Sequence, residues 1–324
     1  MIDFSGQSVL VTGAGRGLGR LYALEVARRG ASVLVNDLGC STKGDGTDSK
    51  IADEVAAEIV DMGGSAVASY DSVSDPQSAG RIIEAAVESF GRLDAVISNA
   101  GIFGTTAFED LQPDEWRRML NVHLDGGFYL SQAAYRVMKR QGGGRLVFIS
   151  SSAGMFGQPM AAHYAAAKTG LAGLTNVIAI EGEAHGIKAN AVLPSGISRM
   201  ATETVGDEKL LMQSGFMRSI RPELVVPIVV YLASSACSLT HHYYSAAAGR
   251  FARVFIGLSQ GWLAPVDQEP TVEDIAERIE QIANVDDFIV PTSIVDEILE
   301  LCERRGVSAM PDNMEPHVPE TPEG

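Results

Sequence analysis

Short apolar runs alternate with longer segments of helical periodicity through the first 196 residues of the chain. The runs SVLVTG at 8–13 and ASVLVND at 31–37 have the length of buried strands, whereas the segment between them places Leu18, Leu21 and Leu24 on one helical face. This alternation predicts an α/β fold, a doubly wound Rossmann-type parallel sheet with helices on both faces. Each crossover between parallel strands is expected to be right-handed.

The same rhythm continues after the second strand, with a glycine-rich inserted loop at 39–50. Further strands are predicted at 66–71, 93–101, 144–152, 187–196 and around 251–258. Further helices are predicted at 51–62, 75–90, 113–138, 163–184, 222–233, 271–283 and 293–306. We therefore expect a Rossmann domain over 1–260, a C-terminal helical extension packed on it over 261–309, and a disordered Pro- and Glu-rich tail over 310–324.

The acidic balance of the chain restricts its partners. The 324 residues carry a formal net charge of −16, and such a field repels nucleic acid and anionic membranes. Its cysteines, Cys40, Cys237 and Cys302, show no metal-type spacing, which indicates a reduced intracellular setting without a metal site. The sequence shows no secretory signal, bilayer-length apolar run or peroxisomal address, so we expect a cytoplasmic protein.

The first strand leads into a glycine-rich turn, TGAGRGLG at 12–19. Gly13, Gly17 and Gly19 fit the spacing GxxxGxG, which allows a tight turn and lets a pyrophosphate approach the backbone at a helix N-terminus. Glycines also occur in ordinary strand-to-helix turns, so the motif alone leaves that alternative open. The strand before it and the helix after it favour dinucleotide binding.

The second strand ends in Asp37, 18 residues after Gly19. A carboxylate at about this distance holds the adenosine ribose hydroxyls and repels a 2′-phosphate, which favours NAD over NADP. Arg16 in the glycine loop could face such a phosphate instead. We give Asp37 more weight, because an arginine can turn to solvent whereas a misplaced carboxylate is directly repulsive.

Tyr164 and Lys168 lie four residues apart in the alanine-rich run HYAAAKTGL, one helical turn from each other on one face. A phenol has a pKa near 10, and a nearby ammonium group lowers it. The pair can therefore form a general acid/base. A tyrosine and a lysine at this spacing also occur by chance, so the pair needs support from other residues.

Several separated motifs together resemble the short-chain dehydrogenase/reductase family. These are TGAGRGLG, NAG at 99–101, Ser151, and the pair Tyr164 and Lys168. Ser151 lies 13 residues before Tyr164, the spacing that this family shows, whereas its two serine neighbours do not have that spacing. The resemblance covers roughly residues 5–260.

The resemblance implies a role for each matching residue. Tyr164 moves the proton, Ser151 hydrogen-bonds the substrate oxygen, and Lys168 binds the nicotinamide ribose and tunes Tyr164. Asn121 holds a water molecule in the proton relay. The implied cofactor contacts are Gly13, Arg16, Gly17, Leu18, Gly19, Asp37, Leu38, Asp71, Ser72, Asn99, Ala100, Gly101, Tyr164, Lys168, Pro194 and Gly196.

Four segments resemble the (3R)-hydroxyacyl-CoA dehydrogenase modules of peroxisomal multifunctional enzymes type 2, also described as 17β-hydroxysteroid dehydrogenases type 4. They are VNDLG at 35–39, YDSV at 70–73, SRMATETV at 198–205 and SAAAGRFARVFIG at 245–257. This implies an NAD-dependent oxidoreductase that interconverts a 3-hydroxyacyl-CoA and a 3-oxoacyl-CoA. The alternatives are a dehydrogenase for hydroxysteroids or other bulky secondary alcohols, and a dinucleotide-binding protein without turnover. LPSGIS at 193–198 departs from those modules.

Two loops are expected to border the substrate, at 152–160 and 197–220. Flexible and aromatic side chains there suit an apolar group, and arginines suit the phosphates of CoA. The candidate substrate residues are Ser151, Met155, Phe156, Met200, Phe216, Arg218 and Arg221. In the family, the helices at 113–138 and 163–184 form a two-fold interface, which implies a homodimer or homotetramer.

Overall fold

The computed structural model describes residues 2–196 and 214–309 of the chain. The predicted substrate residue Met200 and the predicted tail at 310–324 lie outside the described residues. The chain divides into two compact units, Met1–Val254 and Phe255–Gly324. The sequence placed this boundary after residue 260, and the packing of the extension on the first unit stays a prediction.

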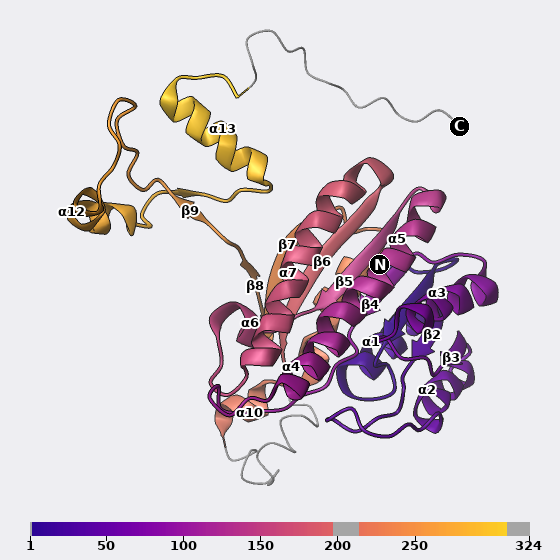
Figure 1. Cartoon of the computed structure of the whole chain (residues 1–324). Coiled ribbons are helices and arrows are strands. Elements are labelled where there is room, and N and C mark those ends of the chain that lie inside the picture. The colour runs from indigo at the N-terminus through magenta and orange to yellow at the C-terminus, as the bar shows by residue number, and fades with distance from the viewer. Residues whose placement is uncertain (1, 197–213, 310–324) are drawn as a thin grey trace. The chain divides into compact units, whose positions relative to one another are not determined.

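The first unit is built on an eight-stranded sheet with the strand order β3-β2-β1-β4-β5-β6-β7-β8 (Figure 1). All neighbouring pairs are parallel except β7 and β8, which are antiparallel. The predicted doubly wound sheet is therefore confirmed, with one antiparallel edge strand added. The strands are β1 (Ser8–Thr12), β2 (Ser32–Asn36), β3 (Ser65–Ser69), β4 (Ala95–Ser98), β5 (Gly144–Ile149), β6 (Ile187–Ser195), β7 (His242–Ala247) and β8 (Arg250–Val254).

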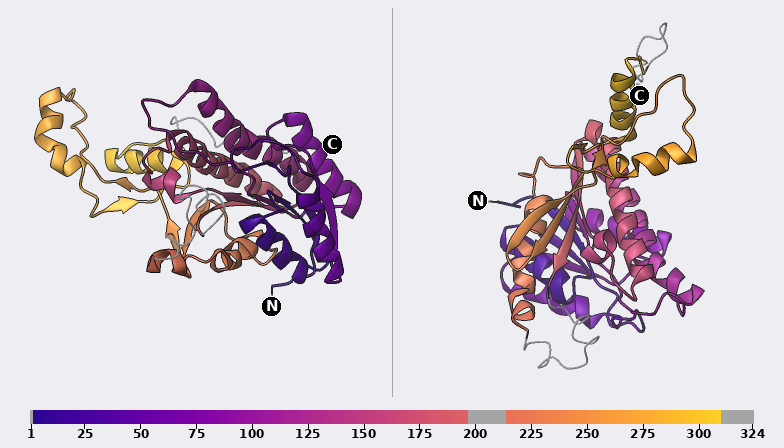
Figure 2. Two further views of the ribbon diagram at one scale, coloured as in Figure 1. Left: turned by 90° about the horizontal axis from the view of Figure 1, so that it is seen from below. Right: turned by 90° about the vertical axis from the view of Figure 1, so that its left-hand side faces the viewer.

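Helices cover both faces of this sheet (Figure 2). They are α1 (Gly17–Arg28), α2 (Lys50–Asp61), α3 (Pro76–Phe90), α4 (Pro113–Leu120), α5 (Gly126–Gln141), α6 (Ser152–Phe156), α7 (Ala162–Gly182), α10 (Gly215–Ser219) and α11 (Val226–Ala233).

Alternate residues of each strand enter two separate hydrophobic cores. In β1, Val9 and Val11 pack with α1, α2 and α11, whereas Leu10 between them packs with α3, α5 and α7. Successive side chains of a strand point to opposite faces, and each face of a parallel sheet must be covered. This is why the predicted strands read as continuous apolar runs without polar alternation.

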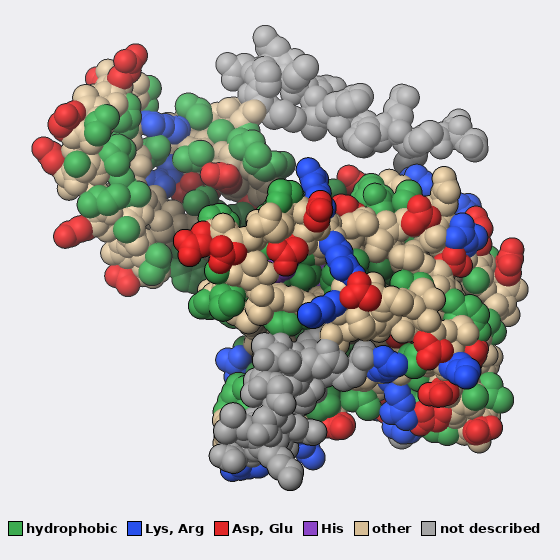
Figure 3. Space-filling model, turned by 60° about the horizontal axis from the view of Figure 1, so that its bottom comes forward, with side chains coloured by type: hydrophobic (Ala, Val, Ile, Leu, Met, Phe, Trp, Pro, Cys, Tyr) green, Lys and Arg blue, Asp and Glu red, His purple; other side chains and the backbone are tan. Residues whose placement is uncertain are grey.

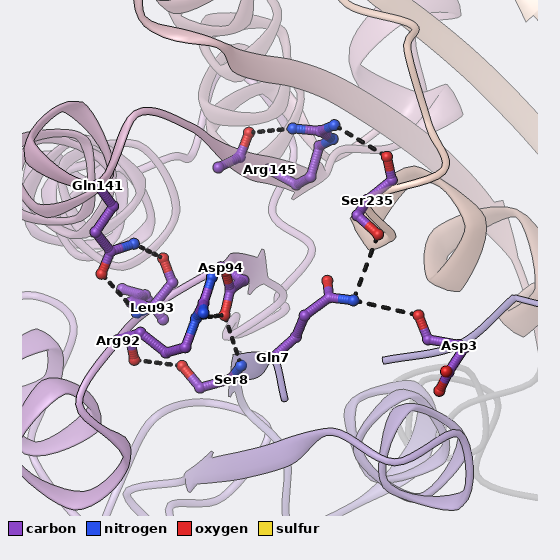
Figure 4. Close-up of polar contacts among 10 residues, drawn as sticks. Asp3, Gln7, Ser8, Arg92, Leu93, Asp94, Gln141, Arg145 and Ser235 are labelled. Atoms are coloured by element: carbon purple, nitrogen blue, oxygen red, sulfur yellow. Dashed lines mark hydrogen bonds and ion pairs between the residues drawn. The ribbon is translucent and has the colours of Figure 1, made fainter. Parts of the chain in front are cut away.

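A network of polar contacts joins the elements at the amino ends of the central strands (Figure 4). The backbone amide of Ser8 donates to Asp94 at 2.8 Å, and Gln141 accepts from the amide of Leu93 at 3.0 Å. Arg145 donates to the carbonyl of Cys237 at 3.0 Å. These side chains bond to neighbouring backbone and thereby stabilise the fold at this end. The opposite, carboxyl end of a parallel sheet is where ligands bind in α/β proteins.

Two local predictions were wrong. The segment 113–138 is not one helix, because a π-helical turn at Asn121–Asp125 separates α4 from α5. Strand β7 was missed, and it forms a hairpin with β8 through Ala248 and Gly249, which both have positive φ. Two such residues give the turn that fits the twist of paired strands, but an alanine in that conformation leaves little signal in the sequence.

The second unit contains the antiparallel pair β9 (Leu258–Ser259) and β10 (Phe288–Ile289) and two helices, α12 (Val272–Ile282) and α13 (Ile294–Arg305). Both helices begin at capping boxes, Thr271 with Asp274 and Ser293 with Asp296. Their bounds agree with the predicted segments to within a residue or two.

Basic and acidic side chains are interspersed over the described surface in the view of Figure 3, where no extended basic stripe is seen. Among the described residues, no helix has both the length and the apolar character needed to cross a bilayer. Within that same part of the chain, no group of three or more His, Cys, Asp or Glu side chains is arranged to hold a metal ion.

Candidate active site

A cavity of about 670 Å³ lies in the first unit, where the glycine turn and the carboxyl ends of several parallel strands contribute to its lining. Every residue that the sequence assigned to catalysis or to cofactor binding lines this cavity, although these residues are spread from Gly13 to Gly196. The fold therefore brings all the separated motifs together.

The glycine turn leaves no space for side chains at two of its positions. Gly13 has φ +61°, and a Cβ on it would lie 2.9 Å from the Cα of Ala100. A Cβ on Gly19 would lie 2.0 Å from the carbonyl oxygen of Gly13. Helix α1 begins at Gly17, and no described side chain caps its first amides. A close backbone and uncapped amides fit the pyrophosphate of a dinucleotide.

The Asp37 carboxylate binds the backbone of both the glycine turn and the inserted loop. One of its oxygens accepts from the amide of Gly15 at 2.8 Å, and the other accepts from the amide of Gly39 at 2.7 Å. The sequence reasoning missed Gly15, where a Cβ would lie 2.2 Å from a side-chain carbon of Ile51. Asp37 therefore carries a negative charge to the cavity and also holds the glycine turn.

Asn36, the neighbour of Asp37, holds the segment around Asp71 at the cavity. The buried Asn36 side chain donates to the carbonyl of Asp71 at 3.0 Å. The Asp71 carboxylate in turn pairs with Arg81 at 2.5 Å. On the other side of β1, the Thr12 hydroxyl accepts from the amides of Asn99 and Ala100, each at 3.0 Å. These bonds fix the ends of β2 and β4 around the cavity.

Lys168 is buried beside Tyr164 on α7. Its ammonium lies 5.6 Å from the centre of the Tyr164 ring and donates to the carbonyl of Ile149 at 2.6 Å. Burial lowers the pKa of Lys168 to about 7.

The sequence predicted that Lys168 would lower the pKa of Tyr164, but that pKa is raised. Burial raises it, and a hydrogen bond with Ser151 acts in the opposite direction. The physical reason is that burial disfavours the phenolate more than its surroundings stabilise it. The neutral phenol is therefore the favoured form of Tyr164 in this structure.

The structure distinguishes Ser151 from its neighbour Ser150. The Ser150 hydroxyl is buried and donates to the carbonyl of Lys168 at 2.8 Å, so it ties β5 to α7. Ser151 caps α6, accepts from the amide of Ala153 at 3.1 Å and hydrogen-bonds Tyr164. The spacing argument and the geometry both point to Ser151 as the serine beside the tyrosine.

Asn121 begins the π-helical turn between α4 and α5. The amide of Gly126 bonds to its carbonyl, five residues back along the chain. Single π-helical turns of this kind are frequent at functional sites. The helix is thus interrupted at Asn121, the residue for which the family resemblance implies a role in the proton relay, and Asn121 lines the cavity.

Most of the predicted substrate residues do not line the cavity. Met155 is partly buried and packs against the hydrophobic core that contains Leu10, and Phe156 and Phe216 are exposed. Arg218 and Arg221 are also exposed and lie outside the lining. Sequence spacing placed these side chains near Ser151 or in one loop but could not tell which way each of them points.

Other residues, absent from the predicted set, complete the cavity wall. The inserted loop contributes several of them, and its Thr42 carbonyl accepts from the amide of Phe103 at 2.9 Å. Arg118 from α4 reaches the same wall and pairs with Asp45 of that loop. The additional lining residues include Cys40, Ser41, Thr42, Gly44, Phe103, Arg118, His123, Gln158 and Met217.

The chain is similar in sequence and in fold to known proteins. Residues 7–209 match the family described as short chain dehydrogenase. A short-chain type dehydrogenase/reductase of Mycobacterium tuberculosis is 41% identical over 277 residues, which cover 86% of this chain and 94% of the relative.

Longer proteins are also similar. The peroxisomal multifunctional enzyme type 2 of Mus musculus is 38% identical over 95% of this chain, which spans only 41% of that enzyme's length. The solved full-length peroxisomal multifunctional enzyme type 2 from Drosophila melanogaster superposes with a TM-score of 0.75 at 30% identity, covering 94% of this chain and 50% of that one. By its sequence motifs, its fold and these matches, the chain belongs to the short-chain dehydrogenase family.

Proposed function

We propose that this protein is an NAD-dependent dehydrogenase that interconverts a 3-hydroxyacyl-CoA and a 3-oxoacyl-CoA. The observation that carries the proposal is the convergence of Asn121, Ser151, Tyr164 and Lys168 on the cavity formed by the glycine turn. A protein that only bound the dinucleotide would have no need of all four side chains. The non-catalytic alternative is therefore disfavoured.

The side chains of the cavity divide the chemistry among them. Nicotinamide dinucleotide, when bound, supplies the acceptor for the hydride that leaves the carbinol carbon. Tyr164 passes its own proton to the water that Asn121 holds, its phenolate oxygen takes the hydroxyl proton of the alcohol, and Ser151 holds the oxygen that becomes the ketone. Lys168 holds the cofactor ribose, and Asn121 holds the water through which the proton leaves. In the reverse direction, the neutral phenol favoured by burial is ready to donate its proton.

The substrate class rests on the relatives. The similar proteins include peroxisomal multifunctional enzymes type 2 from animals and hydratase-dehydrogenase-epimerases from fungi. A 3-oxoacyl-[acyl-carrier-protein] reductase of Synechocystis is also 35% identical over 72% of this chain. The name of the last relative specifies an acyl thioester with an oxo group at its third carbon, and the names of the fungal relatives join a dehydrogenase to a hydratase. Both support the acyl thioester over a free steroid.

The test is a substrate panel. Purified protein is mixed with NAD or NADP and with 3-hydroxyacyl-CoAs of several chain lengths, their N-acetylcysteamine thioesters, or hydroxysteroids, and reduced cofactor is followed by absorbance. We expect turnover of the acyl-CoAs with NAD and a markedly higher KM for the short thioesters. A clear preference for hydroxysteroids would replace the proposal by that alternative, and no turnover of any alcohol would support the non-catalytic one.

Asp37 is expected to impose at least a tenfold preference for NAD over NADP, equivalent to about 1.4 kcal/mol. Its charge repels a 2′-phosphate. Replacing it by Ala or Ser should relax the preference, with the half-buried Arg16 then available to the phosphate. Because Asp37 also accepts from Gly15 and Gly39, affinity for NAD should fall in the same variants.

The measurement compares kcat/KM for the two cofactors. Asp48→Ala is the matched control, because Asp48 lies in the loop after Asp37 and is exposed, and its carboxylate accepts only from the nearby Lys50 amide in the described structure. Equal use of NAD and NADP by the wild type would show that the electrostatic argument is wrong.

We also propose that the protein is a homodimer or homotetramer. The faces of α5 and α7 carry exposed apolar side chains, among them Phe128, Val177 and Ile180, which are between about two fifths and about half exposed. Apolar faces of this kind on neighbouring helices suit a symmetric interface. Light scattering at micromolar concentration should give at least twice the chain mass of 34.3 kDa, and a particle of single-chain mass would contradict the proposal.

A further inference from the structure

His123 is a buried histidine that the proposed chemistry does not yet use. It lies in the π-helical turn two residues after Asn121 and is 4% exposed. Its ring contacts Tyr164 edge to face, with ring centres 5.3 Å apart, and it lines the same cavity. One side chain thus contacts the proposed acid/base and follows the proposed water-holding residue in the chain.

The loop after β4 is shaped to receive this ring. His123 Nε2 lies 2.7 Å from the carbonyl oxygen of Ile102. A Cβ on Gly101 would lie 2.3 Å from the ring carbon Cε1, so a side chain at that position would displace the histidine. The ring therefore packs between this loop and Tyr164 of α7.

Two contacts of Nε2 with Ile102 bear on the tautomer: the carbonyl oxygen lies at 2.7 Å and the amide nitrogen at 3.2 Å. The amide could donate to a bare Nε2, but the carbonyl oxygen can only accept, and at the shorter distance two lone pairs would then face each other. The shorter contact therefore favours the tautomer with the proton on Nε2. Burial and the Lys168 ammonium lower the pKa of His123 well below its usual range, so the imidazole is neutral. Its other nitrogen, Nδ1, is then an acceptor, and it has no hydrogen-bond partner within the described residues.

We infer that His123 is a positioning residue whose Nδ1 accepts a hydrogen bond from a water molecule in the catalytic cavity and orients it in the proton path from Tyr164. The inference rests on the proposed function. A buried acceptor without a donor is unfavourable, and internal water commonly supplies the donor. In this tautomer Nδ1 can only accept, so the bound water points one of its hydrogens at Nδ1. The lone pairs of the water oxygen then stay available to accept a proton that comes from Tyr164.

Three substitutions separate this role from simple packing. His123→Phe keeps a ring against Tyr164 and Gly101 but removes both nitrogens. His123→Gln can restore a donor toward Ile102, whereas His123→Asn can restore an acceptor near the position of Nδ1. His163→Asn is the control, because His163 is also buried with an unpartnered Nδ1 in the described structure but does not line the catalytic cavity.

We expect His123→Phe to lower kcat about tenfold, equivalent to about 1.4 kcal/mol, with the KM for NAD within about twofold of wild type. The solvent deuterium isotope effect on kcat should rise, because proton movement becomes slower. His123→Asn should recover most of the rate, and His123→Gln should not. Recovery by Gln alone, an unchanged His123→Phe, or an equal loss in His163→Asn would overturn the inference.

A second measurement does not depend on turnover. Imidazole ¹H–¹⁵N spectra of the folded wild-type protein should show His123 with the proton on Nε2 and a bare Nδ1. A proton on Nδ1 would overturn the inference even if every rate agreed. If no alcohol of the panel is oxidised, the proposed function fails, while the spectra still report whether His123 presents the acceptor.

Discussion

Tyr164→Phe is expected to remove turnover while leaving NAD binding nearly intact. The phenylalanine ring keeps the contacts of Tyr164 with Phe103 and His123, whose ring centres lie 5.2 and 5.3 Å away. It has no oxygen to accept the substrate proton, so we expect kcat to fall by on the order of 10²-fold or more. Steady-state kinetics with the best alcohol of the panel and NAD titration by fluorescence provide the two measurements.

Tyr135→Phe is the matched control for this change. The Tyr135 hydroxyl donates to the carbonyl of Glu181 at 2.8 Å, on the surface between α5 and α7 and outside the cavity lining of the described structure. Its removal should leave kcat unchanged. If Tyr164→Phe retained substantial activity with normal NAD binding, another group would have to move the proton.

Lys168→Met is expected to lower both the rate and the affinity for NAD, and at the same time to stabilise the fold at neutral pH. The buried ammonium has a native pKa of about 7 against an ordinary value of 10.5. At a pH between these two pKa values, Lys168 is protonated in the unfolded chain but not in the native chain. The stability of the wild type therefore falls as pH decreases from about 10.5 to about 7 and loses nothing further below that. The methionine side chain does not titrate, so the stability of the variant lacks this pH dependence.

Thermal unfolding over this pH range measures the effect. The Tm of Lys168→Met minus that of the wild type should grow as pH falls toward 7 and then level off. Lys139→Met is the control, because Lys139 is an exposed residue near the end of α5. A difference that shrank toward neutral pH would mean that the native structure favours the charged lysine, through its bond to Ile149 and its contact with Tyr164.

The amino-acid sequence was sufficient for the fold class and for many of the side chains that line the cavity beside the glycine turn. Strands, helices and the glycine turn depend on hydrophobic periodicity and on local backbone conformation, and both can be read from the residues of a single segment. The spacing from Ser151 to Tyr164 and from Tyr164 to Lys168 is likewise a local quantity along the chain. For this reason these side chains were predicted, and the structure brings them to one cavity.

Properties that depend on contacts between distant segments had to come from the three-dimensional structure. The raised pKa of Tyr164 follows from burial, which no spacing expresses. The position of the inserted loop on the cavity wall depends on Thr42 bonding Phe103, far away in the chain. The orientation of His123 depends on the π-helical turn and on space left by Gly101. All three properties arise where residues that are remote in sequence pack against one another. Such packing, and not periodicity along the chain, determines which side chains face the cavity.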